Sequence, residues 1–295
     1  MAKSEVMLGD VKVGNNMFPY MIAEIGINHN GDINIAKKLI DAAFACEWDN
    51  VKFQKRVPDI CVPEDQKNKI RETPWGTMTY IEYKRRIEFG KKEYDEIDSY
   101  CKMKPITWSA SPWDMESLQF ILKYDIPYIK IASALNMEKD MLIEACKSGK
   151  TIIASTGMSD FKDVDRMVDI LEKEGKGNYI LMHTNSQYPT PNNETNVRVV
   201  QTLKERYGCI VGYSGHEQDL QASIAATVLG AKVIERHVTL SHSMMGSDHK
   251  ASLEVQAMTI LKKRITDTIL SLGDGRKFIS EGELEVSKKL RPHAV

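Results

Sequence analysis

The sequence predicts a (β/α)8 barrel, and three observations support this fold class. Eight short apolar runs recur along the 295 residues, and nearly every run ends in a polar, charged or hydroxyl residue. Segments with helical periodicity separate the runs, as expected for alternating strands and helices. The spacing is nearly regular, because all intervals but one fit a strand, a helix and two short loops. Catalytic groups of such barrels come from the carboxyl ends of several strands, so the run ends also supply candidate site residues.

The eight predicted strands share an apolar body and a polar end. In order they are MIAEIGIN at 21–28, VKFQK at 51–55, ITWSAS at 106–111, YIKIAS at 128–133, TIIASTGM at 151–158, YILMHTN at 179–185, CIVGYSGH at 209–216 and VIERHVTL at 233–240. A doubly wound parallel sheet is the alternative architecture. That sheet would carry a glycine-rich phosphate loop after its first strand, whereas the chain reads NHNGD there, so the barrel is favoured.

The remaining segments divide into three regions. Residues 1–18 contain VMLGDVKVGNN, which alternates around a Gly-Asp pair and predicts a β-hairpin that caps the barrel. Residues 19–275 form the barrel itself, and residues 276–295 are a polar tail. The one long interval predicts an insertion over 58–90 after the second strand. Because long βα insertions lie on the catalytic face, we expect it to act as a lid or a binding loop.

Three intervening segments carry clear helix signals. DINIAKKLIDAAFACE has Asp32 as an N-cap, and SDFKDVDRMVDILEKEG begins at Ser159 or Asp160 and stops at Gly175. The segment LEVQAMTILKKRITDTILSLGDG is the longest amphipathic candidate, and we expect it to close the barrel.

Composition excludes several classes of partner. The 40 basic and 41 acidic residues nearly cancel, so no global charge favours nucleic acid or a membrane surface. Five scattered cysteines without a C-x-x-C pair indicate reduced thiols. MAKSEVMLGD lacks the apolar stretch of a signal peptide, and no run reaches the ~20 apolar residues of a membrane helix. We therefore expect a cytoplasmic protein that binds neither nucleic acid nor membrane.

Two histidines predict a metal site. His216 ends the seventh run and His237 lies in the eighth, so a barrel places them on neighbouring strands at one face. Adjacent strands are about 4.8 Å apart, which lets two imidazoles share one ion. A lone histidine is more often structural, but a matched pair favours metal binding and leaves positions open for substrate oxygens. His183 also falls in a strand, without such pairing.

Charged side chains inside apolar strands are the second signal. Lys52 and Lys130 must face the cavity or a carboxylate, because a closed barrel has no edge strand. Together with Arg236 they could bind an anion, and a Schiff-base lysine is the rival interpretation. Glu24 and Glu235 are the strand acids, suited either to ion pairs with these lysines or to proton transfer.

Five serines follow apolar runs at equivalent positions, which is typical of a pocket wall; they are Ser111, Ser133, Ser155, Ser186 and Ser214. Gly157 and Gly215 permit close backbone approach there. No GxSxG elbow surrounds any of the serines, so a serine hydrolase is disfavoured.

Seven motifs together resemble the sialic acid synthase family: AEIGINHNGD, VKFQK, YIKIAS, IIASTGM, TNSQYPTP, GYSGH and IERHVTL. The likeness spans roughly residues 10 to 290 in the family's order. It implies an enzyme that condenses phosphoenolpyruvate with an aldose, such as an N-acylated amino sugar, to give a nonulosonic acid and phosphate for a surface glycan. It also implies a homodimer and a divalent metal, with Mn2+ expected and Mg2+ or Co2+ as alternatives.

The resemblance implies roles for individual positions. His216 and His237 would hold the metal, while Glu24, Lys52 and Lys130 would act at the reacting centre. Tyr188 and Asp248 would contact the acceptor sugar. Positions that would bind phosphoenolpyruvate, beside the two lysines, are Gln54, Ser111, Ser133, Ser155, Ser186 and Ser214.

Two departures from the family pattern affect the acceptor. The family's antifreeze-like domain, which lends an arginine to the partner subunit's sugar site, is missing after KKLRPHAV, so a separate chain could supply this lid. The usual KIGSGE segment reads KIASALN, which puts Leu135 where an acid is expected. Because leucine cannot hydrogen-bond a sugar, the acceptor should differ from N-acetylmannosamine. Two alternatives stay open: a binding or regulatory subunit without turnover, and a Schiff-base aldolase using Lys130 or Lys52.

Overall fold

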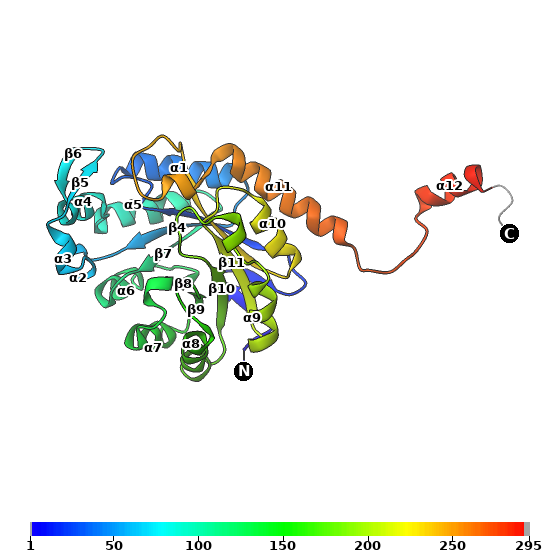
Figure 1. Cartoon of the computed structure of the whole chain (residues 1–295), viewed down its shortest axis with the longest axis horizontal. Coiled ribbons are helices and arrows are strands. Elements are labelled where there is room, and N and C mark those ends of the chain that lie inside the picture. Colours follow the sequence, from blue (N-terminus) through cyan, green and yellow to red (C-terminus); the bar gives the residue numbers. More distant parts are fainter. Residues whose placement is uncertain (1, 292–295) are drawn as a thin grey trace.

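Eight parallel strands form the predicted barrel in a computed structural model that describes residues 2–291 (Figure 1). The sheet order is β7-β4-β3-β12-β11-β10-β9-β8, and the hydroxyl of Ser109 on β7 donates to the carbonyl of Tyr128 on β8 at 3.0 Å, which joins its two ends. The strands are β3 (Tyr20–Gly26), β4 (Asn50–Lys55), β7 (Thr107–Pro112), β8 (Tyr128–Ile131), β9 (Thr151–Ser155), β10 (Tyr179–Thr184), β11 (Ile210–Gly215) and β12 (Val233–Thr239). Each predicted strand is confirmed.

Helices surround the strands on the outside. They are α1 (Ile33–Ala45), α5 (Lys91–Lys102), α6 (Met115–Ile121), α7 (Lys139–Lys147), α8 (Phe161–Lys173), α9 (Val199–Tyr207), α10 (Gln221–Val228) and α11 (Val255–Leu272). The predicted caps are confirmed, since the side chains of Asp32 and Asp160 accept backbone N–H groups at the starts of α1 and α8. Three single 3-10 turns lie in the loops, at Ser133–Leu135, Asn192–Glu194 and His249–Ala251.

Strand alternation divides the barrel interior into an apolar floor and a polar upper part. On β12, Val233 belongs to the floor cluster, whereas Glu235 and His237 line a cavity above it. Ile234, which lies between Val233 and Glu235 in the sequence, points outward and packs against the helices. The same parity holds on β3, where Ile22 lies in the floor and Glu24 lines the cavity. A charged residue in an apolar run therefore faces either the upper interior or the helix layer.

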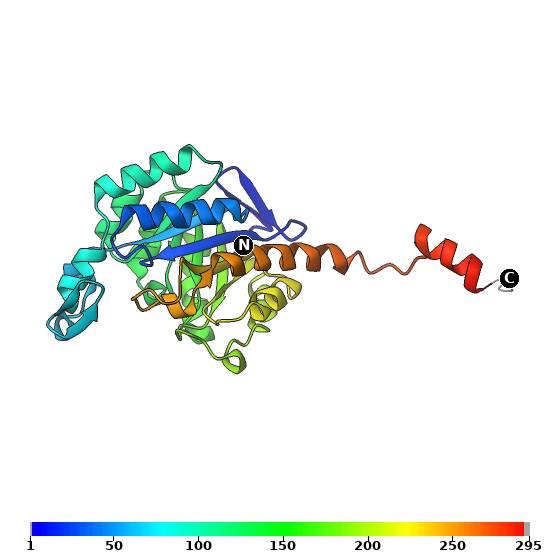
Figure 2. The same cartoon turned by 90° about the horizontal axis from the view of Figure 1, so that it is seen from above.

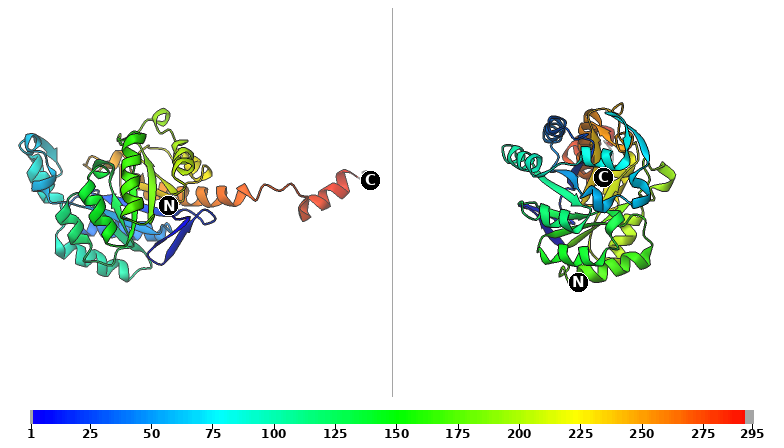
Figure 3. Two further views of the ribbon diagram at one scale, coloured as in Figure 1. Left: turned by 90° about the horizontal axis from the view of Figure 1, so that it is seen from below. Right: turned by 90° about the vertical axis from the view of Figure 1, so that its left-hand side faces the viewer.

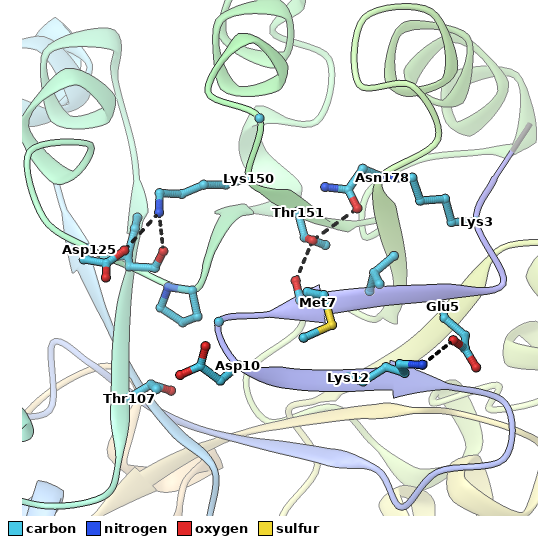
Figure 4. A pocket seen from close by; sticks show the side chains of 15 residues that line it. Lys3, Glu5, Met7, Asp10, Lys12, Thr107, Asp125, Lys150, Thr151 and Asn178 are labelled. Atoms are coloured by element: carbon cyan, nitrogen blue, oxygen red, sulfur yellow. Dashed lines mark hydrogen bonds and ion pairs between the residues drawn. The ribbon is translucent and has the colours of Figure 1, made fainter.

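The predicted N-terminal hairpin is present, and it packs against the floor. β1 (Glu5–Leu8) pairs antiparallel with β2 (Val11–Gly14), and Val6, Leu8 and Val13 are buried in the floor cluster. Beside it, the Thr151 hydroxyl donates to the Met7 carbonyl at 2.7 Å in a surface hollow of about 690 Å3 (Figure 4). This hollow lies at the amino ends of the strands, a face that serves stability in such barrels.

The insertion after β4 contains five short elements that project from the barrel (Figures 1 and 2). They are α2 (Pro58–Cys61), α3 (Glu64–Lys67), the antiparallel pair β5 (Ile70–Thr73) and β6 (Gly76–Thr79), and α4 (Tyr80–Ile87). A capping box between Thr79 and Glu82 fixes the start of α4.

The C-terminal segment leaves the barrel after α11. The short strand β13 (Leu253–Glu254) pairs with β12 before α11 begins. The predicted polar tail contains α12 (Glu281–Leu290), which lies well away from the barrel body and buries none of its side chains (Figure 3); residues 292–295 lie outside the described residues. Across residues 2–291, no helix has the length and apolar content needed to cross a bilayer. All five cysteines are free thiols.

Candidate active site

A cavity of about 200 Å3 opens at the carboxyl ends of the strands, and all eight strands or the loops that directly follow them line it. It brings together every residue for which the family resemblance implies a role, except Asp248. These residues are Glu24, Lys52, Gln54, Ser111, Lys130, Ser133, Ser155, Ser186, Tyr188, Ser214, His216 and His237.

Lys52 is held by two oxygens on neighbouring strands. Its Nζ lies 2.5 Å from Oε2 of Glu24 on β3 and 3.0 Å from the Ser111 hydroxyl on β7. Burial alone would lower the pKa of Lys52, but the carboxylates of Glu235 and Glu24 raise it above the usual value. This amine is therefore a fixed positive charge.

The positive charge of Lys130 is balanced less fully by nearby carboxylates than that of Lys52. Its Nζ donates to the Ser155 hydroxyl at 2.6 Å and lies 3.7 Å from Oε1 of Glu235. Burial is the larger effect here, assisted by the positive charge of Lys52, so the pKa of Lys130 falls below its usual value despite Glu235.

Glu235 sits between the two lysines. Its Oε1 is 3.6 Å from the Lys52 amine and accepts the Ser214 hydroxyl at 3.1 Å, while Oε2 has no hydrogen-bond partner. Although burial raises the pKa of Glu235, the adjacent Lys130 and Lys52 lower it below the usual range. The predicted acid–lysine ion pairs are present, and one carboxylate oxygen remains unsatisfied.

Gly157 brings two serine hydroxyls close together on the wall. A Cβ at this position would lie 2.4 Å from Oγ of Ser186 and 2.6 Å from Oγ of Ser133. Only a residue without a side chain permits this approach, as predicted for Gly157. The two hydroxyls are thus directed at one part of the cavity.

Gln54 connects Glu24 to Arg56, which directly follows β4. Its Nε2 donates to Oε1 of Glu24 at 3.1 Å, and its Oε1 accepts from the guanidinium of Arg56. Arg56 also stacks on Trp113, 4.4 Å from the ring centre. This chain of contacts fixes the orientation of the Glu24 carboxylate.

The two histidines direct their Nε2 atoms at one point. The Tyr188 hydroxyl lies 2.8 Å from Nε2 of His216 and 3.5 Å from Nε2 of His237. Nδ1 of His216 is 2.5 Å from the Asn185 carbonyl, so it carries the proton and leaves a lone pair on Nε2. Burial and the neighbouring His237 lower the pKa of His216 to about 3, so its ring is neutral.

This geometry fits a divalent metal with two protein ligands. Neutral imidazole nitrogens suit manganese and its neighbours, and the tautomer of His216 is the one that binds through Nε2. Among the described residues, no group of three or more His, Cys, Asp or Glu side chains could hold an ion. The remaining coordination positions would therefore belong to water and substrate oxygens.

Asp248 lies at the cavity edge rather than in its wall. Its Oδ2 is 3.8 Å from the otherwise unpartnered Nδ1 of His237, and its Oδ1 accepts the Ser247 hydroxyl at 2.5 Å. Leu135 does not line the cavity, because it packs against the hydrophobic core while its neighbour Ala134 faces the opening.

One sequence interpretation is wrong, and the histidine that the sequence left unpaired lies outside the cavity. Arg236 does not join the lysines, since it is fully buried in the helix layer, 2.9 Å from the Glu217 carboxylate. It follows Glu235 by one residue, so strand parity turns it away from the cavity. His183 likewise points outward, and its Nε2 contacts the Thr195 carbonyl at 2.7 Å.

Five cavity residues were missed by the sequence analysis: Ala132, Ala134 and three larger residues. Thr184 ends β10 with inward parity, Trp113 directly follows β7, and Met158 follows Gly157 with a φ of 58°. Parity could have identified Thr184. The loop conformations that aim Trp113 and Met158 leave no periodic signal.

Comparison with known proteins agrees with this geometry. The NeuB family model matches residues 39–277. The chain belongs to the NeuB family. It is 35% identical over 271 residues to N,N'-diacetyllegionaminic acid synthase of Campylobacter jejuni, covering 89% of this chain and 80% of that one. It is 37% identical over 255 residues to N-acetylneuraminate-9-phosphate synthase of Drosophila melanogaster, covering 85% and 68%.

A solved NeuB relative has the same architecture over its whole length. The N-acetylneuraminic acid synthetase of Leptospira borgpetersenii, crystallised with citrate, superposes with a TM-score of 0.86 at 29% identity. The match covers 99% of this chain and 98% of that one. The predicted family and barrel are both confirmed, and this NeuB protein is an enzyme of the synthase type.

Proposed function

We propose that this NeuB protein condenses phosphoenolpyruvate with an aldose to form a nonulosonic-type 2-keto-3-deoxy sugar acid. The supporting observation is one cavity that holds both a lysine–serine end, where Lys52 pairs with the carboxylates of Glu24 and Glu235, and a two-histidine end. A synthase of this kind needs both ends, because one reactant is a phosphate ester and the other an aldehyde.

The lysine–serine end suits phosphoenolpyruvate. Lys52 and Lys130 offer two ammonium groups for its phosphate and carboxylate, and the hydroxyls of Ser111, Ser155 and Ser214 lie within reach of the same groups. Gln54, with Ser133 and Ser186 beside Gly157, would complete the walls around the enol. A bound anion would also stabilise the charged form of Lys130, whose pKa is lowered whereas that of Lys52 is raised.

The histidine end suits the acceptor. His216 and His237 would hold Mn2+, with Mg2+ or Co2+ as alternatives, and Tyr188 and Asp248 would contact acceptor hydroxyls. When bound, the ion supplies Lewis-acid polarisation of the aldehyde oxygen. C3 of phosphoenolpyruvate bonds to the aldehyde carbon, water adds at C2, and the C–O bond to phosphate breaks. Glu24, fixed by Lys52 and Gln54, would move a proton or position that water.

The surroundings of the reaction belong to the same proposal. We infer a cytoplasmic homodimer acting in surface glycan synthesis, with a lid over the cavity supplied by another chain. Because Leu135 packs into the core and offers no hydrogen bond, we infer an acceptor other than N-acetylmannosamine.

The test is phosphate release from phosphoenolpyruvate in the presence of Mn2+ and a panel of aldoses. His216→Ala and His237→Ala should each abolish stoichiometric Mn2+ binding and turnover. His242→Ala is the matched control, since His242 is half-exposed and outside the cavity. Full metal content in both cavity variants would refute the site, and no phosphate release with any acceptor would count against the reaction.

A Schiff-base aldolase is the second candidate, because the lowered pKa of Lys130 favours a nucleophilic amine. Borohydride trapping with pyruvate separates the two functions. A covalent adduct at Lys130 or Lys52 that forms without metal would favour the aldolase, whereas turnover that is lost on chelation would favour the synthase.

A further inference from the structure

A second cavity, of about 420 Å3, lies between the insertion and the loop that follows β12. Arg71 of β5 and Tyr80, Tyr83 and Lys84 of α4 form one side. Gly246 and Ser247 form part of the opposite side. Because Ser247 directly precedes Asp248, this second cavity adjoins the histidine end of the active site.

Lys84 is a buried cation without a partner. The residue is 7% exposed, and its Nζ lies 5.3 Å from the Tyr80 ring centre and 5.6 Å from that of Tyr83. Within the described part of the chain, no hydrogen bond or ion pair reaches this amine. Burial and the charge of Arg56 lower the pKa of Lys84 to about 8. A buried ammonium group is costly unless an anion compensates it.

The charges around the second cavity favour an anion. Arg71 lies over the Tyr80 ring at 5.0 Å and also lines the space. The carboxylate of Glu72 is engaged by the Thr77 hydroxyl at 2.8 Å. That of Asp248 is engaged by Ser247 and faces His237, so neither acid pairs with Lys84.

The position of the second cavity matches the far end of an acceptor. An aldose with its aldehyde oxygen near His216 and His237 would extend past Asp248. Its last carbon would then approach Lys84 and Arg71 in the adjoining space.

We propose, on the basis of the proposed function, that the acceptor is a phosphorylated aldose whose terminal phosphate binds Lys84 and Arg71. A phosphate monoester carries the charge and the acceptor oxygens that both side chains need. Lysine contributes a point charge, and the planar arginine fork can bind two oxygens at once.

The experiment compares hexoses and hexosamines with their 6-phosphates as acceptors. In the wild type, kcat/KM should be about tenfold to hundredfold higher for the 6-phosphate, the usual worth of a charged hydrogen bond. Lys84→Met and Arg71→Gln should each bring this ratio close to one. Arg85→Gln is the matched control, because Arg85 is adjacent on α4 but pairs with Asp59 outside the second cavity. It should leave the ratio unchanged.

The outcomes separate this inference from the proposed function. Turnover of free aldoses at least as efficient as that of the 6-phosphates would overturn the phosphate site and leave the synthase intact. An unchanged ratio in Lys84→Met and Arg71→Gln, or a raised KM for phosphoenolpyruvate alone, would also overturn it.

Calorimetry keeps the inference testable if no acceptor turns over. Glucosamine 6-phosphate should bind equally well to the wild type and to Arg85→Gln, and about tenfold more weakly to Lys84→Met. Equal binding to all three proteins, or no binding to any, would contradict the site.

Discussion

Gly157 controls the separation of two serine hydroxyls in the cavity. In Gly157→Ala the new methyl group would overlap Oγ of Ser186 and Ser133, so the wall must shift. We expect kcat/KM for phosphoenolpyruvate to fall about a hundredfold, since displacements near 1 Å have that effect on catalysis. Gly282→Ala, in open surroundings on α12, is the control. Wild-type kinetics in Gly157→Ala would show that the serines do not need this approach.

His29 should make stability depend on pH. Burial lowers the pKa of its ring, which stacks on Phe89 at 3.9 Å, to about 3. The unfolded chain takes up this proton below about pH 6.5 but the folded chain does not, so stability falls as the pH drops from 6.5 towards 3. The loss attributable to His29 is about 1.4 kcal/mol per pH unit.

His29→Asn removes the imidazole that takes up a proton in the unfolded chain, and it keeps an acceptor for the N–H of Gly31. Urea denaturation between pH 8 and pH 5 should therefore show a shallower decline than in the wild type, whatever the starting stability. Exposed His242→Asn should keep the wild-type slope. Identical slopes in all three proteins would rule out the buried neutral ring.

The sequence predicted individual site residues correctly where a residue both has inward strand parity and lies near the carboxyl end of its strand. Glu24, Lys52 and His237 share inward parity and meet in the cavity. Arg236 failed because its charge was considered without its parity, which places it among the helices. Trp113 and Met158 are aimed by loop geometry, for which the sequence carries no periodic signal.

At the scale of elements, the buried pair of Arg236 and Glu217 joins β12 to the turn after β11. The guanidinium also donates to the Asp219 carbonyl at 2.9 Å, and the Tyr213 hydroxyl donates to Glu217 at 2.8 Å. Arg236→Met should lower the free energy of unfolding by about 3–5 kcal/mol, because it leaves a buried carboxylate uncompensated.

Urea denaturation of metal-free protein measures this loss. The double variant Arg236→Met with Glu217→Met should recover much of it, since no charge is then stranded. Arg206→Met, which breaks the exposed pair with Asp165, should change stability little. If Arg236→Met were as stable as the wild type, the ion pair of Arg236 and Glu217 would not stabilise the fold.

The strands, the hairpin and the capped helices were predictable because each has a local period or a local cap. The elements of the insertion were not, because α2, α3, β5 and β6 span four residues each. Such short elements have too few residues to show a period, and contacts with α4 and with each other stabilise them.

For the whole molecule, the two ends of the chain should contribute unequally to stability. A stop after Gly273 removes α12, which buries nothing, so Tm should stay within about 2 °C of the wild type. Leu8→Ala in the floor should cost about 2–5 kcal/mol, since Leu8 is fully buried. Thermal melts of both proteins decide this, and a large drop on truncation would mean that α12 docks in solution.

The apolar floor has a kinetic consequence. Val233, Ile22 and the hairpin residues fill the lower interior, so reactants cannot pass through the barrel from below. Both reactants and both products must therefore use the same opening at the carboxyl ends of the strands. Because both reactants share one opening, the reactant that binds deeper must enter first, and the product formed from it must leave last. Steady-state kinetics should accordingly show ordered addition, with the second reactant trapping the first.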